Sequence, residues 1–366
     1  MSQTLLVNKE DFAEVALVNI EEEALDEGCI RLKLGPWALT ANNVTYMLTG
    51  DQIGYWHYFN PADYGIQMDE GDGIKWGRMP VWGYGEVTES RCGEVKVGQR
   101  IYGFLPIADN FDMRPVKLTP HGFQDGMEHR TKLHSLYNGL TFTDKDPSFG
   151  VHEDLQPVLR PLFTTSFLID DFLAEKEFFG AEQVLLLSAS SKTALGTAFC
   201  LKERGALPTI GLTSERNKDF VAGTGFYDGV HTYDAITDMN PDVKTVIVDM
   251  AGNGDVMETV LNHFEENITY ICRVGISHWD AKPNVSTKGK TPSGFFFAPD
   301  QAKARIADWG GAGFNERLGA RWLPFCDSAS HWLTVEKQSG VEPLLKIYKD
   351  MLDGTATPDK GYLFSL

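Results

Sequence analysis

The segment 183–196, with the sequence QVLLLSASSKTALG, constrains the fold of this chain more than any other. Apolar residues 184–187 run into a turn of small polar residues, and a helical pattern follows over residues 193–204. Nucleotide-binding α/β folds begin with a buried strand, a tight turn and a helix whose first amides and dipole favour a phosphate. The pattern G-x-G-x-x-G is missing, because only Gly196 occupies one of its positions. The segment alone therefore leaves open an ordinary strand–helix turn without a ligand.

Further apolar segments repeat downstream of this turn, at residues 208–212, 245–248 and 268–274. The helical patterns between them predict βαβ units and a parallel sheet. Polar residues and glycines follow each segment, at the carboxyl end of the strand, where such sheets bind ligands. The predicted fold class is α/β, with a doubly wound parallel sheet in the second part of the chain.

Composition limits the classes of function. The 366 residues suffice for two domains, and the formal net charge of −18 argues against nucleic acid and anionic membrane surfaces as partners. A nucleotide site in this chain therefore needs its own local cations. The five cysteines are far apart and odd in number, which favours a reducing, cytoplasmic location and no metal site of cysteines. We find neither a secretory signal nor a run long enough to span a membrane.

Residues 1–145 have the pattern of a barrel-like β domain. Glycines and prolines separate short strand candidates at residues 30–34, 84–88 and 100–105. Residues 41–49 have the pattern of a short helix, and residues 46–82 are rich in aromatic side chains. Such a segment forms either a loop packed on itself or a wall of a substrate pocket. Beyond this domain we predict helices over 154–174, 298–308 and 342–352, a loop over 280–294, and a last edge strand over 361–366.

Several of these segments resemble the medium-chain dehydrogenase/reductase superfamily. The matches in the first domain are ALTANN at 38–43, MPVWGYGEV at 79–87 and VKVGQRIYG at 95–103. SSKTALG at 190–196, GLTSERN at 211–217 and FYDGVHTYD at 226–234 are similar to a divergent, uncharacterised branch, known as a domain of unknown function. Within the superfamily, the chain resembles the zinc-free quinone oxidoreductases.

The resemblance implies a division of the chain and an assembly. It implies a GroES-like β-barrel domain over residues 1–145, a Rossmann-type NADP-binding domain over 146–315, and a return to the first domain over 316–366. Members of the superfamily commonly pair their Rossmann sheets into dimers, so we expect a homodimer.

The zinc ligands of the superfamily have no counterpart in this chain. Zinc-binding members place a cysteine and a Gly-His-Glu in the first domain, where this chain has Gly83-Tyr84-Gly85-Glu86. Three nitrogen or sulfur ligands cannot be assembled from these residues. We therefore expect zinc-independent chemistry and no metal ligands.

The resemblance places the phosphates of a dinucleotide at the turn after the first strand. The residues implied there are Ser190, Ser191, Lys192 and Thr193. Lys192 is suited to the pyrophosphate or to the 2′-phosphate of NADP in an acidic protein; a solvated lysine at a helix start is the alternative.

The choice between NADP and NAD falls at the end of the second strand. Ser214 offers a hydroxyl and Arg216 a planar fork for a 2′-phosphate, which favours NADP; a helix cap with a solvated arginine is the alternative. Glu215 would repel that phosphate unless it points to solvent. Ala251 and Gly275, after the fourth and fifth strands of the superfamily pattern, are expected to contact the nicotinamide and its ribose.

The resemblance implies catalytic residues in the first domain, where zinc-free members often hold polar substrate contacts. Tyr46 would donate a proton and Asn42 a hydrogen bond to a carbonyl, although either residue is equally consistent with a structural role. His278 follows the fifth strand and reaches either the cleft or the surface. The sequence therefore predicts a zinc-independent, NADP(H)-dependent oxidoreductase acting on a small carbonyl, enone or quinone. A non-catalytic NADP(H)-binding sensor or scaffold is the main alternative, and a protein with another small ligand is the third.

Overall fold

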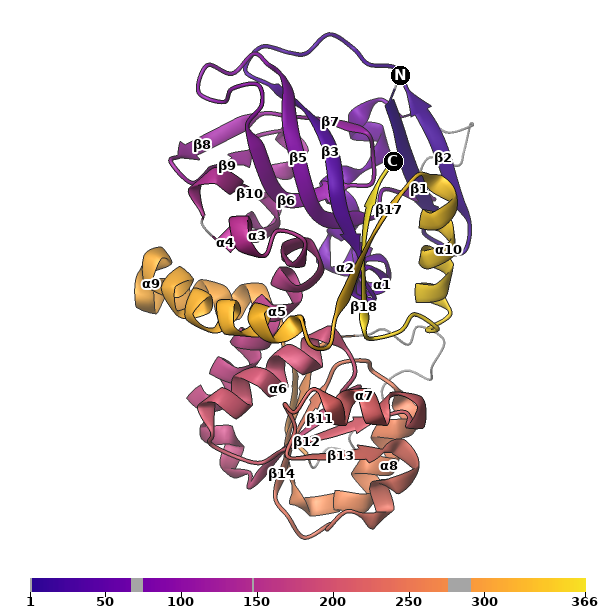
Figure 1. Cartoon of the computed structure of the whole chain (residues 1–366), viewed down its shortest axis with the longest axis vertical. Coiled ribbons are helices and arrows are strands. Elements are labelled where there is room, and N and C mark those ends of the chain that lie inside the picture. The colour runs from indigo at the N-terminus through magenta and orange to yellow at the C-terminus, as the bar shows by residue number, and fades with distance from the viewer. Residues whose placement is uncertain (1, 67–74, 147, 276–290) are drawn as a thin grey trace. The chain divides into compact units, whose positions relative to one another are not determined.

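The chain forms two compact units in a computed structural model that describes residues 2–66, 75–146, 148–275 and 291–366. One unit, called here the β unit, consists of Met1–Val158 and Val335–Leu366, and the other, the α/β unit, of Leu159–Thr334 (Figure 1). The sequence placed these divisions after residues 145 and 315. The first division instead falls within helix α5, Leu155–Glu175, and residue 315 lies inside helix α9, Ala298–Ala329.

Two antiparallel sheets form the β unit. The larger has the strand order β17-β18-β3-β5-β6-β10-β9-β8, with β7 paired to β3, and the smaller has the order β2-β1-β4. The strand bounds are β1 Ser2–Asn8, β2 Val15–Ile20, β3 Ile30–Leu39, β4 Trp76–Gly77, β5 Pro80–Ser90, β6 Arg100–Pro106, β7 Asn110–Met113, β8 Pro115–Thr119, β9 Gly122–Asp125, β10 Gly139–Phe142, β17 Thr334–Ser339 and β18 Lys360–Ser365. The helices of this unit are α1 Asn42–Leu48, α2 Gly50–Ile53, α3 Ser135–Asn138, α4 Ser148–Val151 and α10 Val341–Leu352.

The three predicted strands of the first domain form parts of β3, β5 and β6. The prediction of an edge strand at 361–366 was wrong, because β18 lies between β17 and β3. Strand β17 was not predicted, because its residues TVEKQS are mostly polar and none of them is buried. Glycine is required at one contact between β3 and β5, where a Cβ on Gly83 would come within 2.3 Å of the Trp37 Cβ.

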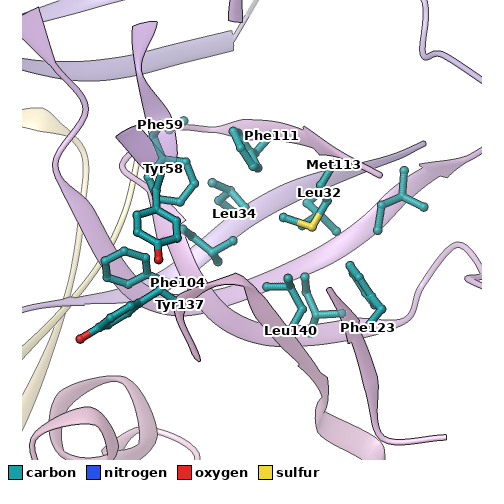
Figure 2. Close-up of a cluster of buried hydrophobic side chains, with 14 of the residues drawn as sticks. Leu32, Leu34, Tyr58, Phe59, Phe104, Phe111, Met113, Phe123, Tyr137 and Leu140 are labelled. Atoms are coloured by element: carbon teal, nitrogen blue, oxygen red, sulfur yellow. The ribbon is translucent and has the colours of Figure 1, made fainter. Parts of the chain in front are cut away.

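The aromatic segment 46–82 contributes mainly to the interior of the β unit. Trp56, Tyr58, Phe59 and Trp76 are all buried, and they belong to three separate apolar cores. Of the two interpretations of this segment, a loop packed on itself therefore describes these four residues. Figure 2 shows the largest of these cores, in which Tyr58 and Phe59 lie near Phe104.

The α/β unit contains a six-stranded parallel sheet with the order β13-β12-β11-β14-β15-β16. The strands are β11 Gln183–Leu187, β12 Thr209–Thr213, β13 Gly229–Thr232, β14 Thr245–Asp249, β15 Ile268–Arg273 and β16 Ser293–Phe295. In order along the chain this is 3-2-1-4-5-6, the order of a doubly wound dinucleotide-binding sheet. The α/β prediction is confirmed, although the short, partly exposed β13 was not predicted.

Helices cover both faces of this sheet. They are α5 Leu155–Glu175, α6 Lys192–Arg204, α7 Lys218–Gly223, α8 Gly254–Phe264 and α9 Ala298–Ala329. On one face, an apolar core joins α8 to the sheet through Met257, Val260, Phe264, Leu185, Leu187 and Ile247. Helix α6 packs closely on α5, because a Cβ on Gly196 would lie 2.7 Å from the Ser166 Oγ. The one glycine that fits the motif therefore serves helix packing.

Helix α9 is longer than the sequence indicated. It is interrupted at Gly310, whose φ of 72° is not helical, so the predicted helix at 298–308 corresponds to its first part. The predicted loop over 280–294 lies mostly outside the described residues, and its last residues begin β16.

Candidate functional site

The turn between β11 and α6 is built from small residues that replace the expected glycines. Ser188 has a φ of 55°, in the left-handed region that glycine occupies without strain. The amide of the buried Ala189 donates to the Leu212 carbonyl oxygen of β12 at 2.9 Å. Ser191 caps α6, because its side chain accepts a hydrogen bond from the Ala194 amide. The turn is therefore fixed both to the next strand and to the helix that follows.

Side chains from the segment after β12 and from both ends of β13 also hold this turn. Asn217 Nδ2 donates to Ser190 Oγ at 3.1 Å, and the Tyr227 hydroxyl donates to the Ala189 carbonyl oxygen at 2.8 Å. The Tyr233 hydroxyl lies 3.4 Å from the Ser188 Oγ. Burial raises the pKa of both tyrosines, so their hydroxyls keep their protons at neutral pH. We did not predict these three residues, although all lie in segments that carried the resemblance.

The end of β12 carries the residues expected to select the cofactor. Ser214 is half-buried, whereas Glu215 and Arg216 are exposed in a short 3-10 turn, Glu215–Asn217. Thr213, the last residue of the strand, is buried. Because β12 pairs with β11, the predicted residues Ser214 and Arg216 follow the strand next to the turn that contains Ser190.

The ends of β14 and β15 complete the same edge of the sheet. The Asp249 Oδ1 accepts hydrogen bonds from the amides of Ala251 and Gly252, at 3.1 and 2.9 Å, and so caps the turn after β14. Gly275 approaches this turn so closely that a Cβ would lie 2.6 Å from the Met250 carbonyl oxygen. All eight predicted cofactor residues therefore follow the carboxyl ends of four adjacent parallel strands.

Cations gather at this edge of a strongly acidic chain. Lys192 is half-buried at the first position of α6, Arg216 is exposed after β12, and the half-buried Lys218 begins α7. A helix start and basic side chains both favour an anion. Lys218 was not among the predicted residues, although it follows Arg216 closely in the sequence.

The predicted catalytic pair lies in the β unit, on helix α1. Asn42 and Tyr46 are four residues apart and so share a helix face. Trp82 Nε1, from β5, donates to the Tyr46 hydroxyl oxygen at 3.0 Å, and the Asn42 side chain also hydrogen-bonds this hydroxyl. Burial is the main cause that raises the pKa of Tyr46, and the bonds from Trp82 and Asn42 partly oppose it. Tyr46 is therefore a neutral phenol with a positioned hydroxyl.

The Tyr46 ring belongs to a group of packed rings that we call the aromatic cluster, defined as Tyr46, Tyr55, Trp82, Phe104 and Tyr137. The centroid of the Tyr46 ring lies 4.7 Å from that of Tyr55 and 5.3 Å from that of Phe104, and the Trp82 ring lies 5.3 Å from Phe104. The hydroxyls of Tyr55 and Tyr137 are 3.0 Å apart. Figure 2 shows Phe104 and Tyr137 beside each other at one end of the apolar core.

Three other expectations concern metals, histidine and membranes. Within the described ranges, the structure contains no group of three or more His, Cys, Asp or Glu side chains able to hold a metal ion. His278 lies outside the described residues. Among the described helices, none combines the length and the apolar character needed to cross a membrane.

Several solved structures have the same fold as this chain. CurA from Vibrio vulnificus, in complex with NADPH, has 12% sequence identity and a TM-score of 0.61, covering 100% of this chain and 99% of that chain. Escherichia coli quinone oxidoreductase, complexed with NADPH, has 13% identity and a TM-score of 0.59, covering 100% of both chains. The yhdH oxidoreductase from Salmonella enterica, in complex with NADP, has 12% identity and a TM-score of 0.52, again covering 100% of both chains.

Sequence comparison identifies the family. No curated protein matches the sequence. The family model described as "Protein of unknown function (DUF2855)" matches residues 37–357, which is most of the chain. The chain therefore belongs to this family, Protein of unknown function (DUF2855), and has the fold of the medium-chain, quinone-oxidoreductase type.

Proposed function

We propose that this protein is a zinc-independent, NADP(H)-dependent oxidoreductase that transfers hydride to or from a small carbonyl, enone or quinone. The observation that carries the proposal is the edge of the parallel sheet where a turn of hydroxyl side chains, a helix start and basic residues meet. Ligands of doubly wound sheets bind at this edge. Three structures with the same fold contain NADPH or NADP, which supports this choice of ligand.

The pyrophosphate of the cofactor is assigned to the turn after β11. Ser190, Ser191, Lys192 and Thr193 supply amides, hydroxyls and one ammonium group there. Phosphate oxygens are strong acceptors that these donors satisfy, and the positive end of the α6 dipole adds to their attraction. Two further amides of the helix start are bonded within the turn, that of Ala194 to the Ser191 Oγ and that of Leu195 to the Ser191 carbonyl oxygen.

NADP is favoured over NAD by the residues after β12. Enzymes that select NAD place a carboxylate at the end of this strand to bind the ribose 2′-hydroxyl. Here the strand ends at Thr213 and Ser214 follows it, and the carboxylate of Glu215 belongs to an exposed residue. Ser214 would donate a hydroxyl to the 2′-phosphate, and Arg216 its planar guanidinium.

The remaining assignments concern the reacting end of the cofactor and the acceptor. Ala251 and Gly275 would contact the nicotinamide and its ribose through backbone atoms, since the close approach at Gly275 leaves no room for a side chain. The bound cofactor supplies or accepts the hydride. Tyr46 would give its proton to the acceptor oxygen, and Asn42 would donate a hydrogen bond to the same oxygen. We place the protein in the cytoplasm, as a homodimer.

Titration with NADPH and, separately, with NADH tests the proposal. A ligand of the folded state raises apparent stability by about 2.7 kcal/mol at about a hundredfold excess over its Kd, which thermal unfolding and nicotinamide fluorescence both detect. We expect tight binding of NADPH and weak binding of NADH. Arg216→Ala should weaken NADPH binding about tenfold or more, the usual worth of a hydrogen bond to a charged group, and should leave NADH binding unchanged. Arg317→Ala, which removes an exposed arginine from α9, is the matched control.

No response to either nucleotide would overturn the proposal. Binding of NADPH without oxidation by any neutral carbonyl, enone or quinone would instead support a non-catalytic NADP(H)-binding protein. One observation favours this second candidate: Tyr46 is only 5% exposed, and its hydroxyl already has two side-chain partners.

A further inference from the structure

Tyr64 and His129 form a hydrogen-bonded pair of phenol and imidazole in the β unit, and neither residue belongs to the proposed hydride-transfer site. The Tyr64 hydroxyl lies 2.9 Å from the His129 Nε2, and the two rings meet edge to face with centroids 5.1 Å apart. Tyr64 ends one 3-10 turn, Pro61–Tyr64, and His129 lies in another, Glu128–Arg130. Both residues are half-buried. The pair therefore brings an oxidisable ring into contact with a base.

Oxidation of a phenol requires a base nearby, because a phenol ring that has lost an electron is a very strong acid. An imidazole, with an ordinary pKa of about 6.5, takes such a proton readily. Tyr58, Tyr84 and Tyr348 instead donate to backbone carbonyl oxygens, which are very weak bases. The Tyr58 carbonyl oxygen also lies 3.5 Å from the Tyr64 hydroxyl, so His129 is the nearer partner as well as the stronger base.

A buried cation lies over the Tyr64 ring. The guanidinium carbon of Arg78 is 5.0 Å from the ring centroid, and Arg78 is only 1% exposed. Burial lowers the pKa of Arg78 to about 10, so the guanidinium keeps its charge at neutral pH. A positive charge left on the ring by loss of an electron alone would be repelled by this group. Arg78 therefore couples the loss of the electron to the loss of the proton.

Loss of the proton alone from Tyr64 is disfavoured too. Burial is the main cause that raises the pKa of Tyr64, and the carboxylates of Asp125 and Asp63 add to it. Arg130 and Arg78 oppose this rise without cancelling it. The phenol is therefore protonated at neutral pH and gives up its proton only when it is oxidised.

The surroundings of His129 suit a proton acceptor. Burial is the main cause that lowers the pKa of His129, and Arg130 adds to it, so the ring is neutral and able to accept a proton at neutral pH. The carboxylates of Asp63 and Asp125 favour the charged ring, as does a hydrogen bond to the Tyr58 carbonyl oxygen. An imidazolium formed here is therefore stabilised by groups already in place.

We propose that Tyr64 and His129 form a site that quenches peroxyl radicals, a function separate from hydride transfer. The peroxyl radical takes one electron from Tyr64 and one proton from the solvent, and leaves as a hydroperoxide. The phenol proton moves along the hydrogen bond to the Nε2 of His129, in the tautomer whose other nitrogen carries the hydrogen, and leaves a neutral tyrosyl radical beside an imidazolium. An enediol reductant such as ascorbate then returns one electron and becomes a radical itself, while His129 returns the proton to Tyr64.

Electron paramagnetic resonance of the full chain, frozen during exposure to peroxyl radicals from a water-soluble azo initiator, tests the proposal. We expect the spectrum of a neutral tyrosyl radical, which narrows when tyrosine deuterated on the ring is incorporated. Tyr64→Phe should lose this signal. Tyr348→Phe, which removes a hydroxyl that donates to a backbone carbonyl oxygen, is the matched control and should retain it. Thermal unfolding checks that each variant folds.

The pH dependence of radical formation identifies the proton acceptor. Above pH 6.5 the imidazole is neutral in the folded chain, so the rate should be constant. Below the folded pKa of His129 the neutral fraction of the ring, and with it the rate, should fall about tenfold for each unit of pH. His129→Gln should lower the rate and abolish this dependence, and the exposed His57→Gln should do neither. Exchange of the solvent for D2O should slow the wild type more than His129→Gln.

Three results would overturn the proposal. They are the absence of a tyrosyl radical in the wild type, a signal that persists in Tyr64→Phe, and a pH dependence that is unchanged in His129→Gln. The first would show that the site is not oxidised, the second that the radical lies on another ring, and the third that the imidazole does not take the proton. Because no nucleotide is present in these measurements, they are independent of whether the protein binds NADPH.

Discussion

Asn217 donates a hydrogen bond from Nδ2 to the Oγ of Ser190 across 3.1 Å, and this bond joins the segment after β12 to the turn after β11. The two residues are 27 positions apart, separated by helix α6 and strand β12. In a glycine-rich turn the backbone itself provides the phosphate cradle. In this chain, side chains from the next strand–helix connection help to hold the turn in place.

Removal of the Asn217 amide should weaken the binding of NADPH. A neutral hydrogen bond contributes about 0.5–1.5 kcal/mol, so Asn217→Ala should raise the Kd for NADPH about two- to tenfold. Fluorescence titration measures this Kd. Asn267→Ala, which removes an exposed amide bonded to the Pro241 carbonyl oxygen, should leave it unchanged. Equal effects of the two substitutions would show that the bond to Ser190 does not support the cofactor site.

Glycine at position 188 should stabilise the protein. Ser188 has a φ of 55°, and a residue with a Cβ in the left-handed region costs roughly 1–2 kcal/mol. Ser188→Gly removes that strain at the expense of a 3.4 Å contact with Tyr233 and of backbone entropy, so we expect a net gain below about 1 kcal/mol. Denaturant unfolding measures it.

A second substitution near the same turn, Gly211→Ala, should have the opposite effect on the free energy of unfolding. A Cβ on Gly211 would lie 2.8 Å from the Ala189 Cβ, so Gly211→Ala should destabilise the turn and the sheet beneath it. If Ser188→Gly were destabilising as well, the hydroxyl of Ser188 would contribute more than its backbone strain costs.

The buried ion pair between Asp125 and Arg130 should be essential to the β unit. Both side chains are fully buried, with Arg130 Nη1 3.0 Å from Asp125 Oδ2, and a second guanidinium nitrogen donates to the Tyr137 carbonyl oxygen. Arg130→Met leaves a carboxylate buried without its cation and should cost about 3–5 kcal/mol. The double variant Asp125→Asn/Arg130→Met should recover part of that loss in thermal unfolding. Lys349→Ala, in an exposed pair with Asp353, is the control and should have little effect.

Lowering the pH should destabilise the β unit, because the folded chain binds a proton at His129 less readily than the unfolded chain does. Burial is the main cause that lowers the pKa of His129 below its ordinary value of 6.5, and Arg130 adds to it, while Asp63 and Asp125 oppose it. The Nε2 of this imidazole lies 2.9 Å from the Tyr64 hydroxyl. Above pH 6.5 the imidazole is neutral in both the folded and the unfolded chain. As the pH falls below that value, the unfolded chain binds the proton first, so stability is lost until the folded pKa is passed.

Unfolding free energies between about pH 8 and about pH 5 measure this loss. His129→Gln should flatten the acid side of the profile, and the exposed His57→Gln should not. An unchanged profile in His129→Gln would assign the acid sensitivity to other groups.

Local patterns were sufficient to predict the sheet of the α/β unit. The apolar residues of β11, β12, β14 and β15 are continuous runs, as expected for strands buried on both faces, so each was found within a residue or two at its ends. Strand β13 was missed because its four residues GVHT are short and partly exposed. The second part of α9 was missed because Gly310 and Gly311 indicate a helix end, although Phe314, Leu318 and Trp322 recur at helical spacing.

The side chains of the candidate sites are held by hydrogen bonds between residues that are far apart in the sequence. A single sequence does not show which distant residues are in contact. Asn42 and Tyr46 were predicted because the resemblance places polar substrate contacts at their positions, but the partner Trp82 lies 36 residues beyond Tyr46 in another strand. Tyr227 and Tyr233 likewise contact the turn after β11 from the far side of β12. Sequence spacing determines neighbours within a helix or strand, whereas these hydrogen bonds depend on how strands pair.

The edge of the parallel sheet should be the contact of the proposed homodimer. Among the described strands, β16 lies at one edge of the sheet, and Phe295 on it is 56% exposed. An unpaired edge presents backbone donors and acceptors to a second strand, and a charged side chain on the edge prevents such pairing. Phe295→Lys should therefore convert a dimer to a monomer in sedimentation velocity, while Leu323→Lys, at another exposed apolar position in α9, should remain dimeric. A wild-type monomer would contradict the homodimer, and a dimer of Phe295→Lys would place its interface elsewhere on the protein.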